Sequence, residues 1–299
     1  MQAAVVVMFP GLGAQYGRMV ERFVAAHPDQ AAALAAAQAR VAAIPGVAAL
    51  PAEARAELDL QVDIHALNLA WWRVAGAALD PAACCGHSLG WYAALVAAGV
   101  IDEAASLDLI AHVFLIGHAA FAQDDGEVAI VTLREPADFA RVAAATGVEI
   151  LCANNAVQHV LHGSPEQLAA VECELGAALL GLMKLPTHIP FHSRRLDVLR
   201  PQLDGLAARL GIRPAPMRRQ LWSHIDARPV ANGAAALALV ETQPWQQVRW
   251  LDMVERLIQA GGYELVEVGP NRVLTQLTRW ICPQLDIEFT DHLRRKERA

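Results

Sequence analysis

Short apolar runs alternate along the chain with longer stretches rich in alanine and leucine. Residues 5–9 and 264–268 are runs of the first kind, and their length and β-branched side chains predict buried strands. Residues 30–41 and 64–78 are of the second kind and predict helices. Such alternation of strands and helices is typical of an α/β fold with a mainly parallel sheet. We therefore expect a large α/β domain built around that sheet.

The middle of the chain has a different order of predicted strands and helices. Its segments read as strand, helix, strand, strand, helix and a final strand, an order typical of a ferredoxin-like unit. The first five of these six segments are residues 127–133, 136–146, 149–153, 158–162 and 165–180. We therefore predict a small ferredoxin-like subdomain over residues 125–189, inserted into a large α/β catalytic domain formed by residues 1–124 and 190–299.

Residues 86–90 read Gly-His-Ser-Leu-Gly, between an apolar run that ends at Cys85 and the alanine-rich residues 91–98. A strand, a sharp turn with Gly-x-Ser-x-Gly and a helix, in that order, predict a hydrolase-like nucleophile elbow. A tight turn leaves little room for a Cβ beside the serine, and glycine tolerates unusual backbone angles. The turn would place the Ser88 hydroxyl at a helix N-terminus, where N–H groups and the helix dipole stabilise negative charge. In the simpler alternative, Ser88 only caps the helix.

Composition and charge disfavour several classes of function. The 299 residues can bury an ample core, and the net charge of −7 disfavours nucleic acid as a partner. No apolar run reaches the roughly 20 residues that span a bilayer, and the first residues suit a buried strand better than a signal peptide. The five cysteines have no metal-ligand spacing and suit a reducing compartment. We expect a cytoplasmic protein with no membrane or nucleic-acid partner and no metal.

Five separated motifs resemble those of one family. Residues 9–15 (Phe-Pro-Gly-Leu-Gly-Ala-Gln) resemble the Phe-Pro-Gly-Gln-Gly-Ser-Gln opening of malonyl-CoA:acyl-carrier-protein transacylases and polyketide synthase acyltransferase domains. Residues 86–90 are similar to the Gly-His-Ser-x-Gly elbow of that family. The other three motifs are Asn154 with Gln158 and Gly163, Pro-Phe-His-Ser at 190–193, and Glu-Val-Gly-Pro at 267–270. Because all five occur in the family's order, the chain is identified as a member.

The resemblance implies chemistry on acyl thioesters through an acyl-serine intermediate. Ser88 would attack the thioester carbonyl, and His192 would take up the hydroxyl proton and return it to the leaving thiol. In this family a carbonyl oxygen orients the histidine, and the matching position is Gln243. The backbone N–H groups of Leu12 and Leu89 would form the oxyanion hole. The family has glutamine where this chain has Leu12, but a main-chain donor survives that change.

The resemblance also assigns the surroundings of this centre. Gln15 and Asn154 would brace the loops around the serine, and His87 would either pack in the turn or shield Ser88. As alternatives, His192 is a loop histidine without a catalytic role, and Gln243 is a solvated polar position. No metal or organic cofactor is implied, because the phosphopantetheine arm arrives on the substrate. The expected partner is acyl carrier protein, with acyl-CoA as an alternative donor.

The arginine that holds the malonyl carboxylate in this family has no counterpart here. The matching position is Val113 in an alignment without a gap, or Ile116 if the following glycine is matched. No arginine or lysine occurs between Arg73 and Arg134. An unpaired buried carboxylate is costly, so we expect weak malonyl selectivity and a preference for short uncharged acyl groups. The side chains that could restore a positive charge are His112, His118, Arg194 and Arg195.

Two further positions bear on the substrate. Trp91 stands where the family usually has glutamate, and would either line the mouth of the site or pack in the core. Phe191 precedes His192, as in family members associated with small unbranched acyl groups.

Several functions stay open on these grounds. The first is transfer of an acyl group between a thioester and the thiol of acyl carrier protein. The second is hydrolysis of acyl carrier protein thioesters, because proofreading acyl hydrolases of polyketide synthases are similar and also lack the arginine. Ordinary malonyl-CoA:acyl-carrier-protein transacylase activity and a non-catalytic homologue that docks a carrier protein are further alternatives. We favour thioester chemistry through acyl-Ser88.

Overall fold

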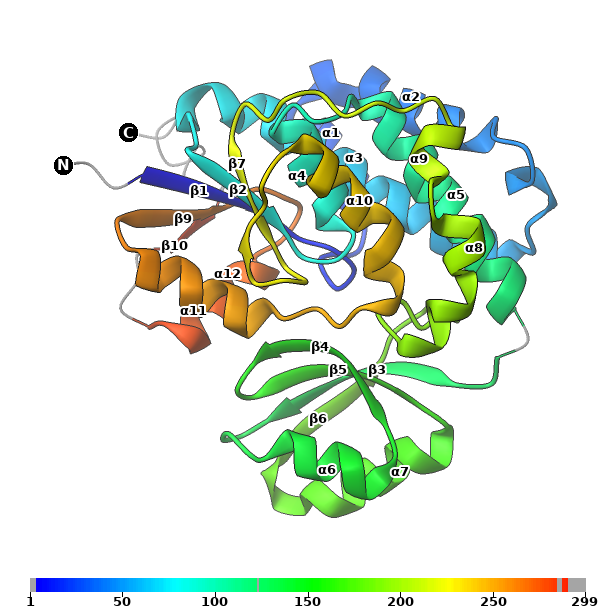
Figure 1. The fold of residues 1–299 in the computed structure, drawn as a ribbon, viewed down its shortest axis with the longest axis vertical. Helices are drawn as coiled ribbons and strands as arrows, with labels where there is room; N and C mark the ends of the chain where they lie inside the picture. The colour runs from blue at the N-terminus through cyan, green and yellow to red at the C-terminus, as the bar shows by residue number, and fades with distance from the viewer. Residues whose placement is uncertain (1–3, 123, 284–286, 290–299) are drawn as a thin grey trace.

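The computed structural model describes residues 4–122, 124–283 and 287–289. The chain forms a large lobe around a six-stranded sheet and a small lobe around a four-stranded sheet (Figure 1). The large sheet has the strand order β10-β9-β1-β2-β7-β8, and among its described strands only β7 and β8 pair antiparallel. Its strands are β1 (Ala4–Phe9), β2 (Ala83–Gly86), β7 (Gln220–Ser223), β8 (Arg228–Pro229), β9 (Tyr263–Glu267) and β10 (Ile287–Phe289). The predicted α/β fold with a mainly parallel sheet is confirmed.

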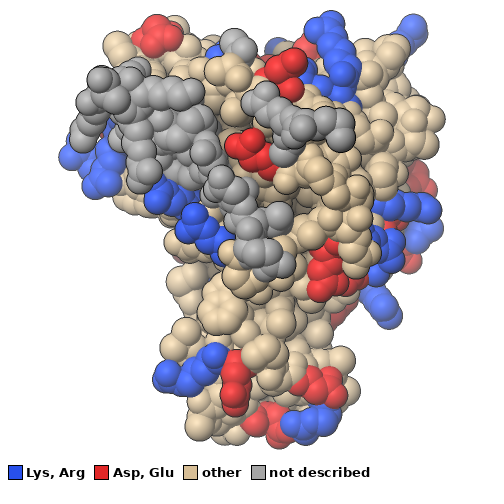
Figure 2. Space-filling model, turned by 90° about the vertical axis from the view of Figure 1, so that its left-hand side faces the viewer, with Lys and Arg blue, Asp and Glu red and all other residues tan. Residues whose placement is uncertain are grey.

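Helices pack around the large sheet (Figure 1). They are α1 (Met19–Ala26), α2 (Ala31–Ala42), α3 (Ala52–Leu79), α4 (Gly90–Ala97), α5 (Glu103–Phe121), α8 (Arg200–Leu203), α9 (Leu206–Arg209), α10 (Gly233–Thr242), α11 (Trp250–Ala260) and α12 (Val273–Ile281). The helix expected over 30–41 is α2, whereas the one expected over 64–78 is the C-terminal part of the much longer α3. Figure 2 shows lysine, arginine and acidic side chains on both lobes of the face that it presents.

Helix α5 corrects one sequence expectation. Within the described residues it is the one helix long and apolar enough to cross a bilayer, with 19 residues and a mean hydropathy of 1.6. The expectation that no such run exists is therefore wrong by length and composition. Half of this helix is buried inside the protein, and Leu109, Ile110 and Phe114 belong to the main core. A buried core helix meets the same criteria as a membrane span.

The small lobe contains the ferredoxin-like order of elements. These are β3 (Glu127–Leu133), α6 (Phe139–Thr146), β4 (Glu149–Asn155), β5 (Gln158–Gly163), α7 (Pro165–Leu175) and β6 (Leu179–Lys184). The sheet order is β4-β5-β3-β6 with antiparallel pairing throughout, and α6 and α7 lie together on its far side from the large lobe (Figure 1). Apolar residues between sheet and helices, such as Val131, Leu161 and Leu168, form a core of their own.

Two helix boundaries in this lobe differ from the prediction. The helix expected over 165–180 ends at Leu175, because Gly176 leaves the helical conformation, and Leu179 already begins β6. The helix expected over 136–146 begins only at Phe139, where the Asp138 side chain accepts a hydrogen bond from the N–H of Arg141. Both errors arise because alanine and leucine give no sharp periodicity at an element's end, so local caps decide where it starts or stops.

The elbow between β2 and α4 packs directly against the end of β1. A Cβ on Gly90 would lie 2.0 Å from the carbonyl oxygen of Phe9, and one on Gly86 would lie 2.2 Å from the carbonyl carbon of Gly90. The N–H of His87 donates to the same Phe9 oxygen at 3.0 Å. Both glycines of the motif are therefore required by contact with backbone, which cannot move aside as a side chain can.

We predict that Gly90→Ala lowers the free energy of unfolding by about 3 kcal/mol or more, because the added methyl group overlaps the β1 backbone. Gly181→Ala in β6 is the matched control, since a Cβ there meets no atom within 4 Å. Urea denaturation followed by circular dichroism measures both. Equal effects of the two substitutions would show that the elbow is not held by this close contact.

Candidate active site

The turn holds Ser88 in a backbone conformation that is uncommon for a residue with a side chain. Its φ is +52°, in the left-handed region, which costs roughly 1–2 kcal/mol for a residue other than glycine. Hydrogen bonds across the turn fix it, from the N–H of Gly90 to His87 and from the N–H of Trp91 to Ser88, both at 2.9 Å. This is the geometry of a nucleophile elbow, with the serine side chain presented ahead of α4.

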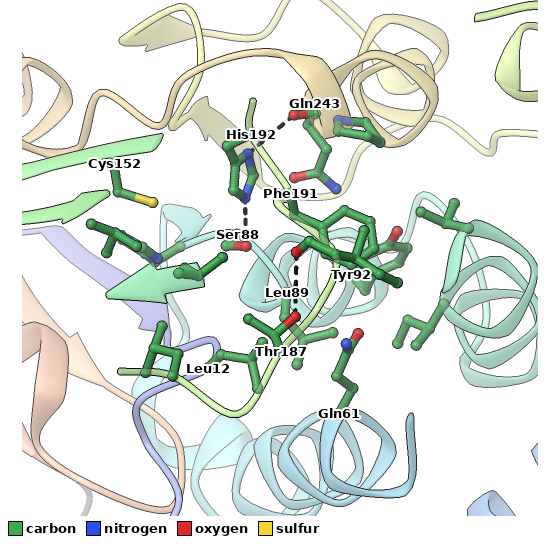
Figure 3. A pocket seen from close by; sticks show the side chains of 18 residues that line it. Leu12, Gln61, Ser88, Leu89, Tyr92, Cys152, Thr187, Phe191, His192 and Gln243 are labelled. Carbon is green, nitrogen blue, oxygen red and sulfur yellow. Dashed lines mark hydrogen bonds between the residues drawn. The ribbon is translucent and has the colours of Figure 1, made fainter. Parts of the chain in front are cut away.

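His192 reaches Ser88 from a loop 104 residues further along the chain. Its Nε2 lies 2.6 Å from Ser88 Oγ, and its Nδ1 lies 3.1 Å from the main-chain carbonyl oxygen of Gln243 (Figure 3). The main-chain carbonyl oxygen of Gln246 lies at the same distance of 3.1 Å from Nδ1. Carbonyl oxygens can only accept, so Nδ1 carries the proton in the neutral ring and Nε2 is the acceptor for the serine hydroxyl. The pair is thus arranged for proton transfer from Ser88 to His192.

The backbone of the histidine is also fixed. The φ of His192 is +75°, and its N–H donates to the carbonyl of Pro244 at 2.7 Å. Gln243 was expected to supply an orienting carbonyl, and the oxygen that reaches His192 is its main-chain carbonyl. The Gln243 side chain instead accepts from His224 Nε2 at 3.0 Å. Gln246 was not anticipated, because a residue that acts through its main chain leaves no signal in the choice of amino acid.

The His192 segment is tied to the small lobe as well. Glu149, the first residue of β4, accepts hydrogen bonds from the Ser193 hydroxyl and from the N–H of Arg194, the latter at 2.7 Å. Residue 248, just beyond the carbonyls that hold His192, pairs with β4 through bonds of 2.8 and 2.9 Å to Ala153 and Leu151. The histidine loop and the separate segment whose carbonyls hold the imidazole are therefore both anchored to β4.

Burial, and to a smaller extent the neighbouring His87 ring, lowers the pKa of His192 to about 4, although the two carbonyl acceptors oppose the shift. Burial also lowers the pKa of His87 and of His224. At neutral pH the imidazole is therefore uncharged and free to accept a proton.

Ser88 and His192 border a small cavity with a volume of about 90 Å³, here called the Ser88 cavity. Its walls are mostly apolar and come from both lobes (Figure 3). The lining residues are Leu12, Gln61, His87, Ser88, Leu89, Tyr92, Ile110, Val113, Val128, Cys152, Val160, Leu185, Thr187, Ile189, Phe191, His192, Gln243 and Pro244. Sequence reasoning named less than half of this set; Gln61, Tyr92 and Thr187 carried no motif that marked them.

Leu12 and Leu89 lie beside Ser88 in this wall, as the resemblance implies. Among the hydrogen bonds of the described chain, none uses the N–H of either residue. The two loops touch, since a Cβ on Gly11 would lie 3.3 Å from the nitrogen of Leu89. Two free main-chain donors near a serine nucleophile are what an oxyanion hole needs.

Two of the side chains predicted to bind substrate lie elsewhere. Trp91 is fully buried, its Nε1 donates to the carbonyl of Ala236 at 3.2 Å, and its ring packs against His224. The prediction that Trp91 lines the mouth of the site is therefore wrong, and the alternative that it packs in the core holds. Ile116 packs against the main core outside the Ser88 cavity, whereas Val113 is part of its wall. Of the two positions that match the family's arginine, Val113 is therefore the one at which a charged side chain would lie in the cavity wall.

Gln15 and Asn154 lie outside the Ser88 cavity but contact the loops beside it. The Gln15 side chain accepts from the N–H of Gly13 at 2.7 Å. The Asn154 amide oxygen lies 2.8 Å from His87 Nε2, and its Nδ2 donates to Gln158 at 3.1 Å. Their bracing contacts are present, and Asn154 also lines a second hollow beside the Ser88 cavity.

None of the four side chains that could replace the arginine lines the Ser88 cavity. His112 lies against the carbonyl of Asp108, and His118 stacks on Phe114. Arg195 forms two bonds of 2.8 Å with Asp124, and Arg194 is exposed. In the described part of the chain, no arginine or lysine lines the cavity and no group of three or more histidine, cysteine or acidic side chains could hold a metal ion.

Comparisons with known proteins show which family the chain is similar to. Residues 6–282 match the family of acyl transferase domains. The chain is 32% identical over 227 residues to the malonyl CoA-acyl carrier protein transacylase of Escherichia coli (strain K12), which covers 74% of this chain and 72% of that protein.

Two solved structures are similar over almost the whole chain. The malonyl-CoA:acyl carrier protein transacylase of Xanthomonas oryzae pv. oryzae has a TM-score of 0.80 and 28% identity, covering 97% of this chain and 95% of that one. A malonyl-transacylase in complex with its type II polyketide synthase acyl-carrier protein has a TM-score of 0.78 and 25% identity, covering 96% and 95%.

Because the neutral form of His192 is the base, reactivity of Ser88 is present above the pKa of His192 and is lost as the pH falls through it. We predict that labelling of Ser88 by a fluorophosphonate keeps its neutral-pH rate down to roughly pH 5 and is halved near pH 4, the value to which burial lowers that pKa. Timed labelling followed by mass spectrometry measures the rate, with circular dichroism at each pH to confirm folding. A midpoint near pH 6.5 would contradict it.

Proposed function

The chain belongs to the acyl transferase family that includes the malonyl-CoA:acyl carrier protein transacylases, and we propose that it transfers short uncharged acyl groups to and from acyl carrier protein through acyl-Ser88. The observation that carries this proposal is the 2.6 Å contact of Ser88 with His192 at the edge of a cavity that no arginine or lysine lines in the described chain. Acyl-CoA is an alternative donor, and the expected location is the cytoplasm.

The reaction begins with attack of Ser88 Oγ on the thioester carbonyl while its proton passes to His192 Nε2. The N–H groups of Leu12 and Leu89 stabilise the tetrahedral oxyanion, each for about 3 kcal/mol. Collapse breaks the carbon–sulfur bond, and the departing thiolate takes the proton from His192. A second thiol then gives its proton to His192 and attacks acyl-Ser88, which reverses the steps and restores the serine.

The acyl preference follows from apolar residues in the cavity wall. Val113 and Ile110 both line the cavity, and Val113 matches the position of the family's arginine in the alignment without a gap. A malonyl carboxylate would lose its hydration without gaining a counter-charge, a cost that an acetyl or butyryl chain does not have. The small volume of the cavity favours a short chain.

A second hollow offers a path for the phosphopantetheine arm. It shares Leu12, His87, Val160 and Leu185 with the Ser88 cavity and is bordered on its outer side by β6, where Leu180 and Met183 are exposed. An arm lying in this hollow would bring its thiol to Ser88. The complex of a similar malonyl-transacylase with its acyl-carrier protein supports a carrier protein as the partner.

Hydrolysis is the second candidate. Water in place of the second thiol would release a free acid, and the absent carboxylate clamp is a feature shared with proofreading acyl hydrolases. A separate hollow lined by Glu149, Arg194, Gln247 and His192 gives solvent a further approach to the imidazole. A purely non-catalytic role is disfavoured, because the contact between Ser88 and His192 has no evident structural purpose.

We predict that acetyl- and butyryl-loaded carrier protein form acyl-Ser88 and that Ser88→Ala abolishes this acylation, with a loss of at least about 10⁴-fold. Mass spectrometry of the intact enzyme detects the intermediate. Ser164→Ala is the control, because that serine caps α7 in the small lobe. Passage of label to a second carrier protein supports transfer, free acid supports hydrolysis, and no acyl-enzyme with any donor contradicts both.

We predict that Val113→Arg raises malonyl turnover at least about tenfold and lowers butyryl turnover, because it supplies a counter-charge inside the cavity. Ile116→Arg, one helical turn further along α5 and outside the cavity, should leave malonyl turnover unchanged. Steady-state rates with malonyl- and butyryl-CoA measure both variants, with thermal unfolding as the check on folding. If only Ile116→Arg raised malonyl turnover, position 116 and not position 113 would be the place for a carboxylate-binding arginine.

A further inference from the structure

Gln61 on α3 carries a buried hydrogen-bond donor that the reaction above does not use. The residue is only 6% exposed, and its Nε2 has no hydrogen-bond partner. Of the buried polar side-chain atoms without a partner in the described residues, this is the one that belongs to the lining of the Ser88 cavity. Figure 3 shows the amide extending from α3 towards the cavity, on the side away from His192.

Five other polar side chains of the cavity have partners within the protein. The Thr187 hydroxyl donates to Glu57, His87 is bonded to Asn154, and the Gln243 side chain is bonded to His224. Ser88 and His192 are bonded to each other. A buried amide N–H without an acceptor is costly, and a guest that brings an acceptor removes that cost. The free N–H therefore indicates a polar atom on the occupant of the cavity.

The charge around Gln61 restricts what that polar atom is. Glu57 lies one turn earlier on the same helix, and its carboxylate accepts from the Thr187 hydroxyl and from the N–H of His188. With no arginine or lysine lining the cavity in the described chain, an anionic guest would find no counter-charge. A neutral oxygen needs only one hydrogen-bond donor, and the Gln61 Nε2 amide group offers two N–H donors without a partner.

We propose that Gln61 Nε2 donates a hydrogen bond to a neutral oxygen on the acyl chain, so that the preferred acyl groups carry a keto or hydroxyl oxygen beyond the thioester carbonyl. This inference rests on the proposed acyl-Ser88 chemistry and names the substrate class within it. Gln61 is a specificity-determining residue here, not a catalytic one, because the reacting carbonyl lies at Ser88.

The test compares acylation of Ser88 by butyryl, 3-hydroxybutyryl and 3-oxobutyryl thioesters of N-acetylcysteamine, measured as kcat/KM. Gln61→Met keeps the length of the side chain and removes the donor. We expect it to lower kcat/KM for the two oxygenated thioesters by about 10-fold relative to kcat/KM for butyryl, the size of effect typical of one neutral hydrogen bond. Dividing each variant rate by the wild-type rate removes differences in intrinsic thioester reactivity.

Gln38→Met is the matched control. The Gln38 amide donates to the main-chain oxygen of Asp59 and to the Asp63 side chain on α3, so its loss disturbs the same helix without touching the cavity. It should alter all three thioesters equally. If butyryl acylates Ser88 but Gln61→Met affects the three substrates equally, the inference is overturned while the proposed function stands. If no thioester acylates Ser88, the proposed function itself fails.

Discussion

The hydrogen bond between Ser88 and His192 joins two segments that are each bent against the ordinary preference of the backbone. Both residues have a positive φ, and each is held there by its surroundings: the elbow by contact with the end of β1, the histidine by main-chain carbonyls after α10. Neither conformation would persist in an isolated peptide. The parallel sheet and the close approach of Gly90 to Phe9 therefore position the nucleophile, and the 243–246 turn positions the base.

Much of this could be predicted from sequence, because the relevant physics is local. The elbow has glycines where backbone crowds the Cβ, and β1 and β3 are apolar runs of ordinary strand length. The nucleophile and the base sit in motifs whose residue types suit their chemistry. These features depend on a few neighbouring residues, so the amino acids themselves carry the signal.

The remainder depends on contacts between distant segments. Trp91 lies on a helix that is apolar on every side, so no periodicity distinguishes the wall of a cavity from the core. Gln246 acts through a carbonyl that every residue possesses, and Gln61 was hidden in a helix that begins earlier than its apolar pattern suggests. Val113 lies in the cavity wall and Ile116 outside it only because of how α5 is rotated about its own axis, and one sequence does not give that rotation.

The attachment of β4 to the histidine loop and to the segment that holds the imidazole has a mechanical consequence. If the small lobe swung outward to admit a substrate, Glu149 and residue 248 would draw the imidazole away from Ser88. The open molecule would thus lack the base that activates Ser88, and the contact between Ser88 and His192 would return only when the lobes closed. If substrate enters by small side-chain movements along the existing hollow, the hydrogen bond between Ser88 and His192 stays intact. A hinge motion would instead leave Ser88 unreactive while the lobes are apart.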